Sequence, residues 1–316
     1  MQQPNLRHLL TTLSALIIIP TAATAESTQS APENQAQRNP SSWSTILRGG
    51  VITQFDTDLD EGGSFDSTRF NIEAGQGYSW SRTDAVSLAL SYSYDGYTFS
   101  ADGDGFAARE PWSDIHTISL SAPLRYGINN EWSTFLIPSI TSTGESGADF
   151  GETVTGGALA GFSYRFGDRL TIGPGIGVFG ELEDSATVIP ILLINWKITY
   201  TLSLETGRGL AATLGPGLNL SYRPNERWRF ILGGRYEKLR FRLDENGSVA
   251  DGVGEDKSFP LYGGVTYQFT RKASLSLVGG VELGGELVLE DENGEEISEE
   301  SYDTAPFLGL TFNVRI

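Results

Sequence analysis

The sequence contains no cysteine, a single methionine and only two histidines among its 316 residues. The lack of cysteine excludes disulfide bonds, thiolate metal sites, a cysteine nucleophile and lipid attachment at an N-terminal cysteine. Basic residues are also scarce, because 22 lysines and arginines stand against 40 acidic residues and the formal net charge is −18. Nucleic-acid phosphates are bound by clustered basic side chains, and so we expect no nucleic-acid partner.

Long hydrophobic runs are missing beyond the N-terminus. No later segment reaches the ~18 consecutive apolar residues of a membrane-spanning helix. At the N-terminus, basic residues precede an apolar stretch over residues 9–19 and a small-x-small pattern that ends at Ala25. This order indicates a cleaved signal peptide over residues 1–25, with a buried N-terminal strand as the alternative. Residues 26–44 are polar and rich in Ser, Gln and Pro, and we expect them to form a flexible periplasmic tail.

The chain is rich in glycine, with 38 residues, and in aromatic residues, at 11%, while its mean hydropathy is only −0.18. An exported chain of this composition is either a soluble β-sandwich or a transmembrane β-barrel, whose apolar residues are spread over many alternating strands. The alternation is clearest at the C-terminus, where every second residue from Leu308 to Ile316 is apolar. This spacing places all the apolar side chains on one face of a strand.

The same alternation recurs upstream, and we predict about fourteen strands in total. They are expected over residues 45–56, 68–80, 84–98, 114–127, 131–142, 153–166, 169–182, 187–196, 199–206, 210–223, 227–243, 258–269, 272–290 and 302–316. A count of about twelve is the alternative, because the two segments that meet near residues 196–199 have the weakest pattern.

The connections between these segments alternate between short and long. The short ones lie at residues 81–83, 129–130, 167–168, 225–226 and 271–272, and the long polar ones at 56–66, 100–113, 142–152, 244–257 and 291–301. Tight periplasmic turns and longer outside loops in this order are typical of an up-and-down barrel, whereas a Greek-key sandwich does not require it. We therefore predict an all-β fold, a closed antiparallel up-and-down transmembrane β-barrel over residues 45–316.

Two further patterns support a membrane barrel. Aromatic residues gather at the strand ends beside the short turns, as in an interfacial girdle; they are Trp80, Tyr126, Trp132, Tyr164, Phe166, Trp196, Tyr222, Trp228, Tyr267 and Phe269. The polar face of the strands is mostly Gly, Ser, Thr and Ala, which suits a crowded polar interior.

The apolar set shifts phase between Tyr236 and Leu239, which predicts a β-bulge near the outer rim, with Arg240 and Arg242 above the membrane.

Several short stretches in the second half carry a resemblance. They are residues 190–192 (PIL), 195–196 (NW), 214–218 (LGPGL), 220–223 (LSYR), 240–244 (RFRLD), 252–255 (GVGE) and 302–307 (YDTAPF). Over roughly residues 170–316 they resemble a family of Gram-negative outer-membrane β-barrels described as a domain of unknown function. The resemblance implies a fold and a location, without substrate or catalytic residues. One departure is Ile316, because such barrels usually end in an aromatic residue that the assembly machinery recognises.

The sequence argues against an enzyme and against a bound metal or cofactor. Outer-membrane lipid hydrolases place a serine two residues after the histidine, on the same strand face. Here Ile118 follows His116 at that spacing, and Ser119 falls on the opposite face. The acidic segment that starts at Asp56 lacks the glycine and the glutamate that a calcium loop has at its sixth and twelfth positions.

Charged residues on the polar strand face are the candidates for lining a pore. They are Arg48, Glu73, Arg125, Arg165, Glu205, Arg223, Arg235, Glu237, Glu282, Glu286 and Arg315. Facing rows of opposite charge would impose a transverse field on a water-filled pore. Alternatively, these groups pair with one another and fill the lumen. The sequence shows no obvious constriction loop.

The predicted function is a passive pore or transporter for small polar solutes in the Gram-negative outer membrane. The alternative is a closed structural or surface-interaction barrel that displays acidic extracellular loops. The expected partners are outer-membrane lipid, lipopolysaccharide bound through bridging divalent ions, and the barrel assembly machinery during biogenesis. The sequence does not determine the oligomeric state.

Overall fold

A computed structural model describes residues 41–207 and 217–316. The signal peptide predicted over residues 1–25 lies outside the described residues, as does the predicted tail apart from residues 41–44. The first strand begins at Ser42, slightly before the predicted start of the barrel, and the last strand ends at Arg315.

The described chain is almost entirely β-strand, with two short 3-10 helices in its loops, η2 (Phe106–Arg109) and η3 (Phe150–Glu152). The strand segments are β1 (Ser42–Asp58), β2 (Ser64–Ser79), β3 (Ala85–Ser100), β4 (Asp114–Ser121), β5 (Leu124–Gly127), β6 (Trp132–Glu145), β7 (Val154–Phe166), β8 (Leu170–Glu181), β9 (Asp184–Lys197), β10 (Leu202–Thr206), β11 (Gly217–Tyr222), β12 (Trp228–Arg235), β13 (Glu237–Arg242), β14 (Val253–Thr270), β15 (Ala273–Glu290), β16 (Glu296–Tyr302) and β17 (Ala305–Arg315).

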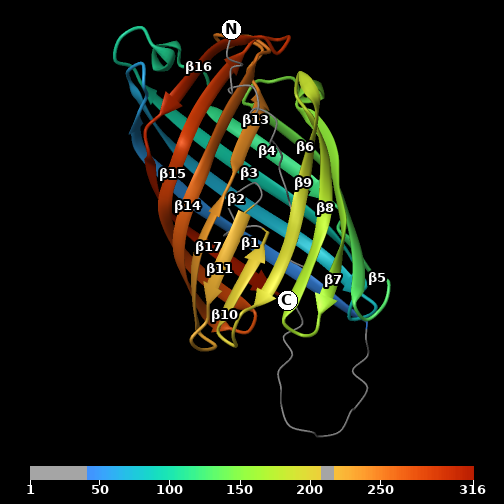
Figure 1. Ribbon diagram of the computed structural model, residues 1–316. Helices are drawn as coiled ribbons and strands as arrows, with labels where there is room; N and C mark the ends of the chain where they lie inside the picture. Colours follow the sequence, from blue (N-terminus) through green and yellow to red (C-terminus); the bar gives the residue numbers. More distant parts are fainter. Residues whose placement is uncertain (1–40, 208–216) are drawn as a thin grey trace, which may run out of the picture.

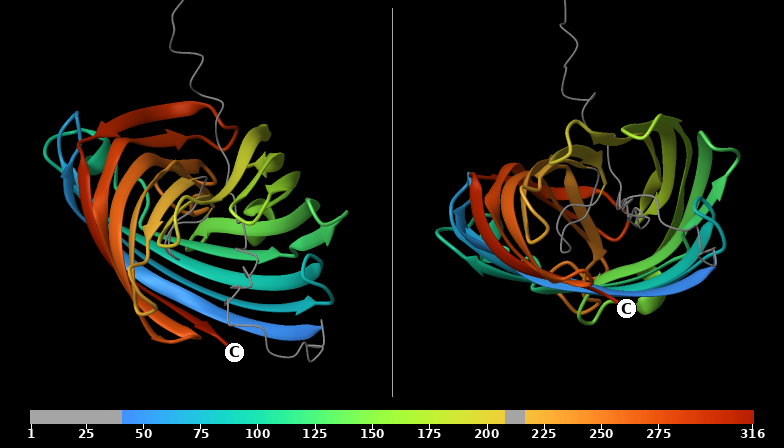
Figure 2. Two further views of the ribbon diagram at one scale, coloured as in Figure 1. Left: turned by 60° about the horizontal axis from the view of Figure 1, so that its bottom comes forward. Right: turned by 90° about the horizontal axis from the view of Figure 1, so that it is seen from below.

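These segments form one closed barrel of 14 strands, which confirms the predicted fold. Three strands are each interrupted once, because β4 and β5 share the neighbour β6, β12 and β13 share β14, and β16 and β17 share β15. The strands run around a common axis, and the ring closes where β1 pairs with β17, with Ile46 opposite Arg315 (Figures 1 and 2). The seam between β9 and β10 is short, since only three residue pairs join these strands.

The two ends of the barrel differ (Figure 1). The short-turn end carries the C-terminus and the start of β1, where the N–H of Thr45 donates to the carbonyl of Ile316 at 3.2 Å. The long-loop end carries the connections at residues 59–63, 101–113, 146–153, 243–252 and 291–295. One connection at this end is tight, because only Leu182 and Glu183 join β8 to β9.

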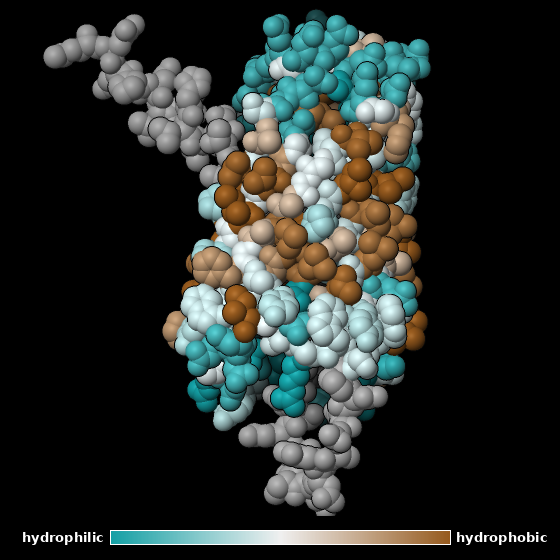
Figure 3. All heavy atoms as spheres, turned by 90° about the vertical axis from the view of Figure 1, so that its right-hand side faces the viewer, coloured by the Kyte–Doolittle hydropathy of each residue, from teal (hydrophilic) through white to brown (hydrophobic). Residues whose placement is uncertain are grey.

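The face of the barrel seen in Figure 3 is an apolar belt between two hydrophilic ends. On β3, β6, β9 and β12, the side chains of Leu88, Leu90, Ile140, Leu192 and Leu232 are each more than half exposed. A continuous apolar surface of this extent is stable against lipid rather than water, which identifies the outside of a membrane-spanning barrel. In the described part of the chain, no helix is long and apolar enough to cross a membrane.

The bulge predicted near Tyr236 is absent. The segments β12 and β13 keep one register against β14, with Glu237 opposite Ser258. The residues of β13 that carry the apolar phase, Leu239 and Phe241, are buried in the interior of the barrel. The prediction is wrong because Leu239 and Phe241 are apolar side chains inside the barrel and do not face lipid.

A bulge lies instead in the next hairpin, where the register between β14 and β15 shifts by one residue beside Gly284. Gly284 has a φ of 57°, a left-handed conformation that glycine adopts without a steric penalty. One extra residue reverses the face on which every following side chain lies. Leu287 and Leu289 are therefore inside the barrel rather than against lipid, and Glu286 is on the opposite strand face, where it pairs with Lys257.

Candidate functional site

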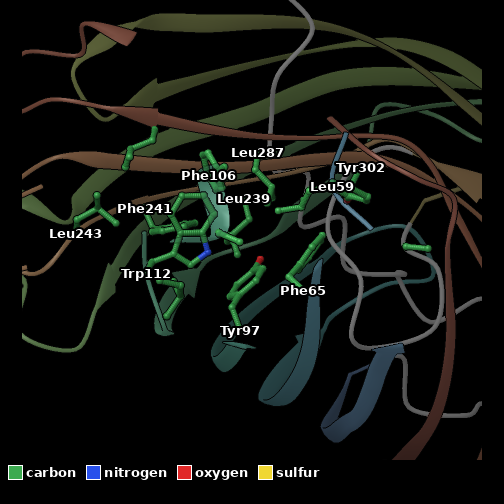
Figure 4. Close-up of a cluster of buried hydrophobic side chains, with 14 residues drawn as sticks. Leu59, Phe65, Tyr97, Phe106, Trp112, Leu239, Phe241, Leu243, Leu287 and Tyr302 are labelled. Atoms are coloured by element: carbon green, nitrogen blue, oxygen red, sulfur yellow. The ribbon is translucent and has the colours of Figure 1, made fainter. Parts of the chain in front are cut away.

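An apolar cluster fills the interior at the long-loop end, and we call it the outer plug (Figure 4). Its buried members are Leu59, Phe65, Tyr97, Phe106, Ala107, Trp112, Ile115, Leu239, Phe241, Leu243, Leu287, Leu289, Tyr302 and Ala305. The ring of Trp112 packs edge-on against Phe241, with centroids 5.1 Å apart, and Phe65 packs edge-on against Tyr302 at 5.0 Å. The outer plug therefore joins the wall formed by β2, β3 and β4 to the wall formed by β13, β15 and β16.

The loop between β3 and β4 contributes to this closure. Phe106 and Ala107 lie on η2, Trp112 follows it, and all three are buried in the outer plug. The sequence shows no obvious constriction loop, but residues 101–113 do place side chains inside the barrel. The loop sequence does not reveal which way Phe106 and Trp112 point, and only the packing of Trp112 against Phe241 of β13 identifies the role of this segment.

Beneath the outer plug lies a network that we call the central ion cluster. The guanidinium of Arg69 on β2 is within 3.0 Å of Glu237 and of Asp256, 3.3 Å of Glu282 and 3.6 Å of Asp95. These carboxylates belong to β13, β14, β15 and β3, so one arginine connects strands from both walls. The five side chains are at most 13% exposed.

Tyrosine hydroxyls connect the central ion cluster to the outer plug. Tyr97 donates to Asp256 at 2.7 Å, and Tyr302 donates to Asp256 at 3.1 Å and to Glu282 at 3.3 Å. The rings of both tyrosines belong to the outer plug. Each tyrosine therefore packs in the outer plug through its ring and binds the central ion cluster through its hydroxyl. Buried carboxylates need such partners, because a buried charge without partners is costly.

Arg235 is the second cation at this level. Its side chain is fully buried, its Nε lies 3.6 Å from Glu237, and its guanidinium carbon lies 5.7 Å from the ring centroid of Tyr262. With Arg69 it faces the four carboxyl groups of the cluster, so the acidic groups outnumber the cations. An excess of buried carboxylate favours cations over anions along the interior.

The structure places the predicted pore residues in four environments. Arg48 and Glu73 form an ion pair with 2.7 Å between Nη2 and Oε1, and Glu282, Arg235 and Glu237 belong to the central ion cluster or contact it. Arg125, Arg165, Arg223 and Arg315 lie toward the short-turn end, with Glu205 on β10 at the β9 seam. Glu286 is separated from them all, because the bulge at Gly284 moves it to the other face of β15.

The pore residues predicted from the sequence do not include three residues of the central ion cluster. Arg69 and Asp95 continue the inward positions of β2 and β3, so the alternation contained a signal for both. Asp256 had no such signal, because residues 244–257 read as a polar loop and the strand in fact begins at Val253. The tight grouping of these three with Glu237 and Glu282 follows only from the curvature of the barrel.

The interior face of β6, β7, β8 and β9 carries apolar residues, contrary to the predicted polar lining. We call this surface the inner apolar wall; it consists of Phe135, Ile137, Leu159, Phe179, Ile189 and Ile191. The alternate residues of the same strands, such as Ile140, Ile176 and Leu192, are about half exposed on the outside. Strands that are apolar on both faces separate lipid from an interior that is itself partly apolar.

Small residues shape the inner apolar wall. A Cβ atom added at Gly157 or at Gly177 would overlap the ring of Phe179. These two glycines therefore let the Phe179 ring lie against the strands instead of projecting into the interior. Gly161 and Gly175 do the same for the ring of Phe135.

A cavity of about 80 Å³, which we call the hydroxyl cavity, opens between this side of the barrel and β13. Hydroxyl groups of Thr117, Ser139, Thr141, Thr143, Thr153 and Thr155 line one side of it. The other side is formed by Lys238, Leu239 and Arg240 of β13 and by the tight β8–β9 turn. The hydroxyl cavity lies on one side of β13, and the outer plug fills the interior on the other side.

Ion pairs hold β13 against the β8–β9 turn. Lys238 Nζ lies 3.1 Å from Glu181, Arg240 Nε donates to the carbonyl of Leu182 at 3.0 Å, and Arg242 pairs with Glu183. The tight turn makes this contact geometrically feasible, because a longer loop would not present three successive acceptors to one strand. Arg240 and Arg242, predicted above the membrane, form part of this contact.

His116 lies on the outer face, as its spacing predicts, while Ser119 is buried inside and accepts from Thr141 at 3.0 Å. A different serine reaches the histidine: Ser146 Oγ is 3.0 Å from His116 Nε2. However, the Ser146 hydroxyl also donates to Asp114 at 2.5 Å. A hydroxyl that gives its hydrogen bond to a carboxylate is not activated by the imidazole, so this is a polar contact at the outer rim rather than a nucleophile with its base.

The acidic turn after β15 is organised by its own backbone. Asp291 accepts from the N–H groups of Glu295 at 2.9 Å and Asn293 at 2.8 Å, and these bonds lower the pKa of Asp291. The carboxylate of Asp291 therefore stabilises the backbone of the turn. Over residues 41–207 and 217–316, no group of three or more His, Cys, Asp or Glu side chains is placed to hold a metal ion.

No protein-family model matches the chain, and no curated protein matches it. Among solved structures, an outer membrane channel from Pseudomonas putida F1 is similar at 11% identity and a TM-score of 0.48, covering 90% of this chain and 100% of that one. A Pseudomonas aeruginosa FadL homologue has 12% identity, a TM-score of 0.44 and coverage of 87% and 89%. The P. putida toluene transporter TodX has 11% identity, a TM-score of 0.41 and coverage of 87% and 90%. Identity this low does not carry a solute preference from one barrel to another.

Proposed function

We propose that this protein is a passive channel of the Gram-negative outer membrane that admits small solutes along one side of its interior. The observation that carries this proposal is the hydroxyl cavity, which leaves space between β13 and the strands β4, β6, β7 and β8. The proposal includes export through a signal peptide cleaved after Ala25 and insertion by the barrel assembly machinery. Lipid around the apolar belt completes the expected environment.

The interior geometry favours a narrow passage over a wide water-filled pore. Arg48 is paired with Glu73, and Arg69 is surrounded by carboxylates, so these charged groups fill space instead of lining an open channel. The outer plug occupies the interior beside them. We therefore expect small current steps with a preference for cations, because acidic groups outnumber the basic ones in the central ion cluster.

Single-channel recording of the refolded full-length mature protein in a planar lipid bilayer tests this proposal. The chain has no cysteine, so single cysteines can be introduced without background. Thr155→Cys lies in the hydroxyl cavity and Leu287→Cys in the outer plug. A charged methanethiosulfonate reagent is expected to reduce the current of Thr155→Cys and to leave that of Leu287→Cys unchanged.

One specific feature favours the second candidate, a closed barrel that displays acidic loops and meets lipopolysaccharide through bridging divalent ions. The outer plug buries aromatic side chains from both walls, as a permanent closure would. Absence of current from protein that is shown to be folded by its heat-modifiable gel mobility would support this candidate against the channel. A reagent effect on Leu287→Cys equal to that on Thr155→Cys would contradict the proposed position of the passage.

A further inference from the structure

The hydroxyl cavity has features of a ligand site beyond those that a passage requires. Its wall carries threonine and serine residues from β4, β6 and β7 and, just before β7, Thr153. Some already have partners: Thr153 donates to the carbonyl of Phe150 at 2.9 Å, and Thr141 donates to Ser119 at 3.0 Å. The inference below rests on the proposed channel only for the access of a ligand to this cavity.

Thr117 differs from these partnered hydroxyls. It is 5% exposed, and its hydroxyl has no hydrogen-bond partner in the part of the chain that the structure describes. It lies opposite Thr143 in the β4–β6 register, and both side chains line the cavity. A buried hydroxyl without a partner is destabilising, and a ligand that supplies a donor or acceptor removes that cost.

The charges at the cavity are already balanced. Lys238 Nζ is 3.1 Å from Glu181 and 3.0 Å from Glu255, and Arg240 Nη1 is 3.0 Å from Glu255. Each cation therefore has carboxylate partners from the barrel itself. A carboxylate or phosphate ligand would have to displace these partners from the cations. An ammonium ligand would have to displace Lys238 from Glu181, which also lines the cavity, so the site favours an uncharged group.

An apolar surface continues from the cavity. Phe179 lines the hydroxyl cavity and also packs in the inner apolar wall with Ile189 and Leu159. The cavity volume of about 80 Å³ is smaller than the roughly 150 Å³ of an apolar cavity that holds benzene. It therefore has space for the polar end of a small molecule, while the apolar remainder lies along Phe179.

We propose that the hydroxyl cavity binds the hydrogen-bonding end of a small uncharged amphipathic molecule, with Thr117 and Thr143 as its polar contacts and Phe179 as its apolar contact. The proposal deepens the channel function by naming the class of solute, an uncharged molecule with an apolar body and one hydroxyl or carbonyl group. It differs from the small polar solutes that the sequence predicts, because the wall beneath the cavity is apolar.

Binding of benzyl alcohol to the full-length mature protein in lipid nanodiscs, measured by saturation-transfer NMR against empty nanodiscs, tests the proposal. Thr117→Val keeps the side-chain shape and removes the hydroxyl. Loss of one hydrogen bond is expected to weaken benzyl alcohol binding roughly twofold to tenfold. Binding of toluene, which has no hydroxyl, is expected to stay unchanged.

Ser221→Ala is the matched control. Ser221 is also buried at 7% exposure with an unpartnered hydroxyl, but it lies on β11, outside the cavity. Both variants remove a buried unpartnered hydroxyl, so both are expected to retain or raise thermal stability. Only Thr117→Val is expected to weaken the binding of benzyl alcohol.

Three results would overturn the proposal: wild-type affinity in Thr117→Val, an equal loss in Ser221→Ala, or an equal loss of toluene binding. Failure of the channel proposal is a separate outcome. If folded protein passes no current but binds benzyl alcohol through Thr117, the binding site is supported and the channel is contradicted. If the protein conducts but shows no Thr117-dependent binding, the channel is supported and the binding site is contradicted.

Discussion

At the scale of single residues, Arg69 has a role that no neighbouring side chain can take over. Its planar guanidinium carries five N–H donors in fixed directions, which allows it to contact several carboxylates at once. Glu237, Asp256 and Glu282 lie within 3.3 Å of it. The positive charge of Arg69 therefore allows these carboxylates, which come from separate strands, to lie close together inside the barrel.

Replacing Arg69 by methionine is expected to destabilise the barrel strongly. The change keeps an apolar stem of similar length and leaves buried carboxylates without their cation, a type of change that costs about 3–5 kcal/mol. The measurement is the free energy of unfolding in urea, followed by gel mobility and tryptophan fluorescence. Asp256→Asn with Glu282→Gln in the Arg69→Met background is expected to recover part of the loss, and no recovery would contradict the electrostatic cause.

Gly157 provides a steric prediction. A methyl group there overlaps the Phe179 ring, so Gly157→Ala is expected to push that ring toward the hydroxyl cavity and to lower the single-channel current. Gly156→Ala is the control, because the nearest atom to its added Cβ is the carbonyl oxygen of Ser139 at 3.8 Å. Equal currents in the two variants would mean that Phe179 does not border the passage.

At the scale of elements, β13 separates a closed part of the interior from an open one. Leu239 and Phe241 pack in the outer plug, while Lys238 and Arg240 line the hydroxyl cavity beside the β8–β9 turn. Successive residues of a strand point to opposite sides, so one strand can hold a plug and border a passage at the same time. Apart from Glu237, which reaches the central ion cluster, β13 is accordingly apolar at its odd positions and basic at its even ones.

Truncation of the plug on β13 tests this division. Phe241→Ala removes a fully buried ring and is expected to cost about 3–5 kcal/mol of stability. It is also expected to raise the current, because it removes a ring from the outer plug on the other side of β13 and opens a second path beside the hydroxyl cavity. Leu261→Ala, on the half-exposed outer face of β14, is the control and should leave the current unchanged. A stability loss without any change in current would mean that the outer plug stays closed without this ring.

At the scale of the whole molecule, ring closure depends on the pairing of β17 with β1. The last residue of the chain, Ile316, is 72% exposed at the short-turn end, and its N–H donates to the carbonyl of Thr45 at 2.8 Å. The position therefore contributes little buried apolar area to the folded barrel. Its effect is expected during assembly rather than on the stability of the finished ring.

On the proposal that the barrel assembly machinery inserts this protein, Ile316→Phe is expected to increase the yield of folded barrel, because such machinery recognises a terminal aromatic residue. The measurement is the fraction of heat-modifiable protein over time in reconstituted assembly reactions. Spontaneous refolding in detergent serves as the control and should be equal for both proteins. A gain in detergent as well would assign the effect to packing and not to recognition.

The sequence by itself determined the strand positions, the strand number and the side of each strand that faces lipid over most of the barrel. This was possible because alternation is local: each side chain points opposite to its neighbour, and lipid selects apolar residues on one face. The ion pair of Arg48 with Glu73 was within reach for the same reason, since the two residues face each other in adjacent strands.

Only the tertiary structure decided what fills the interior. The residues of the outer plug and the central ion cluster are far apart in sequence, as the contacts of Arg69 with Glu237 and Glu282 show. Alternation separates two faces of a strand, but an apolar residue inside a plug is indistinguishable by pattern from one that faces lipid. Alternation alone therefore does not place Leu239, Leu287 or the inner apolar wall inside the barrel, because the bulge at Gly284 and the curvature of the barrel set which side chains meet.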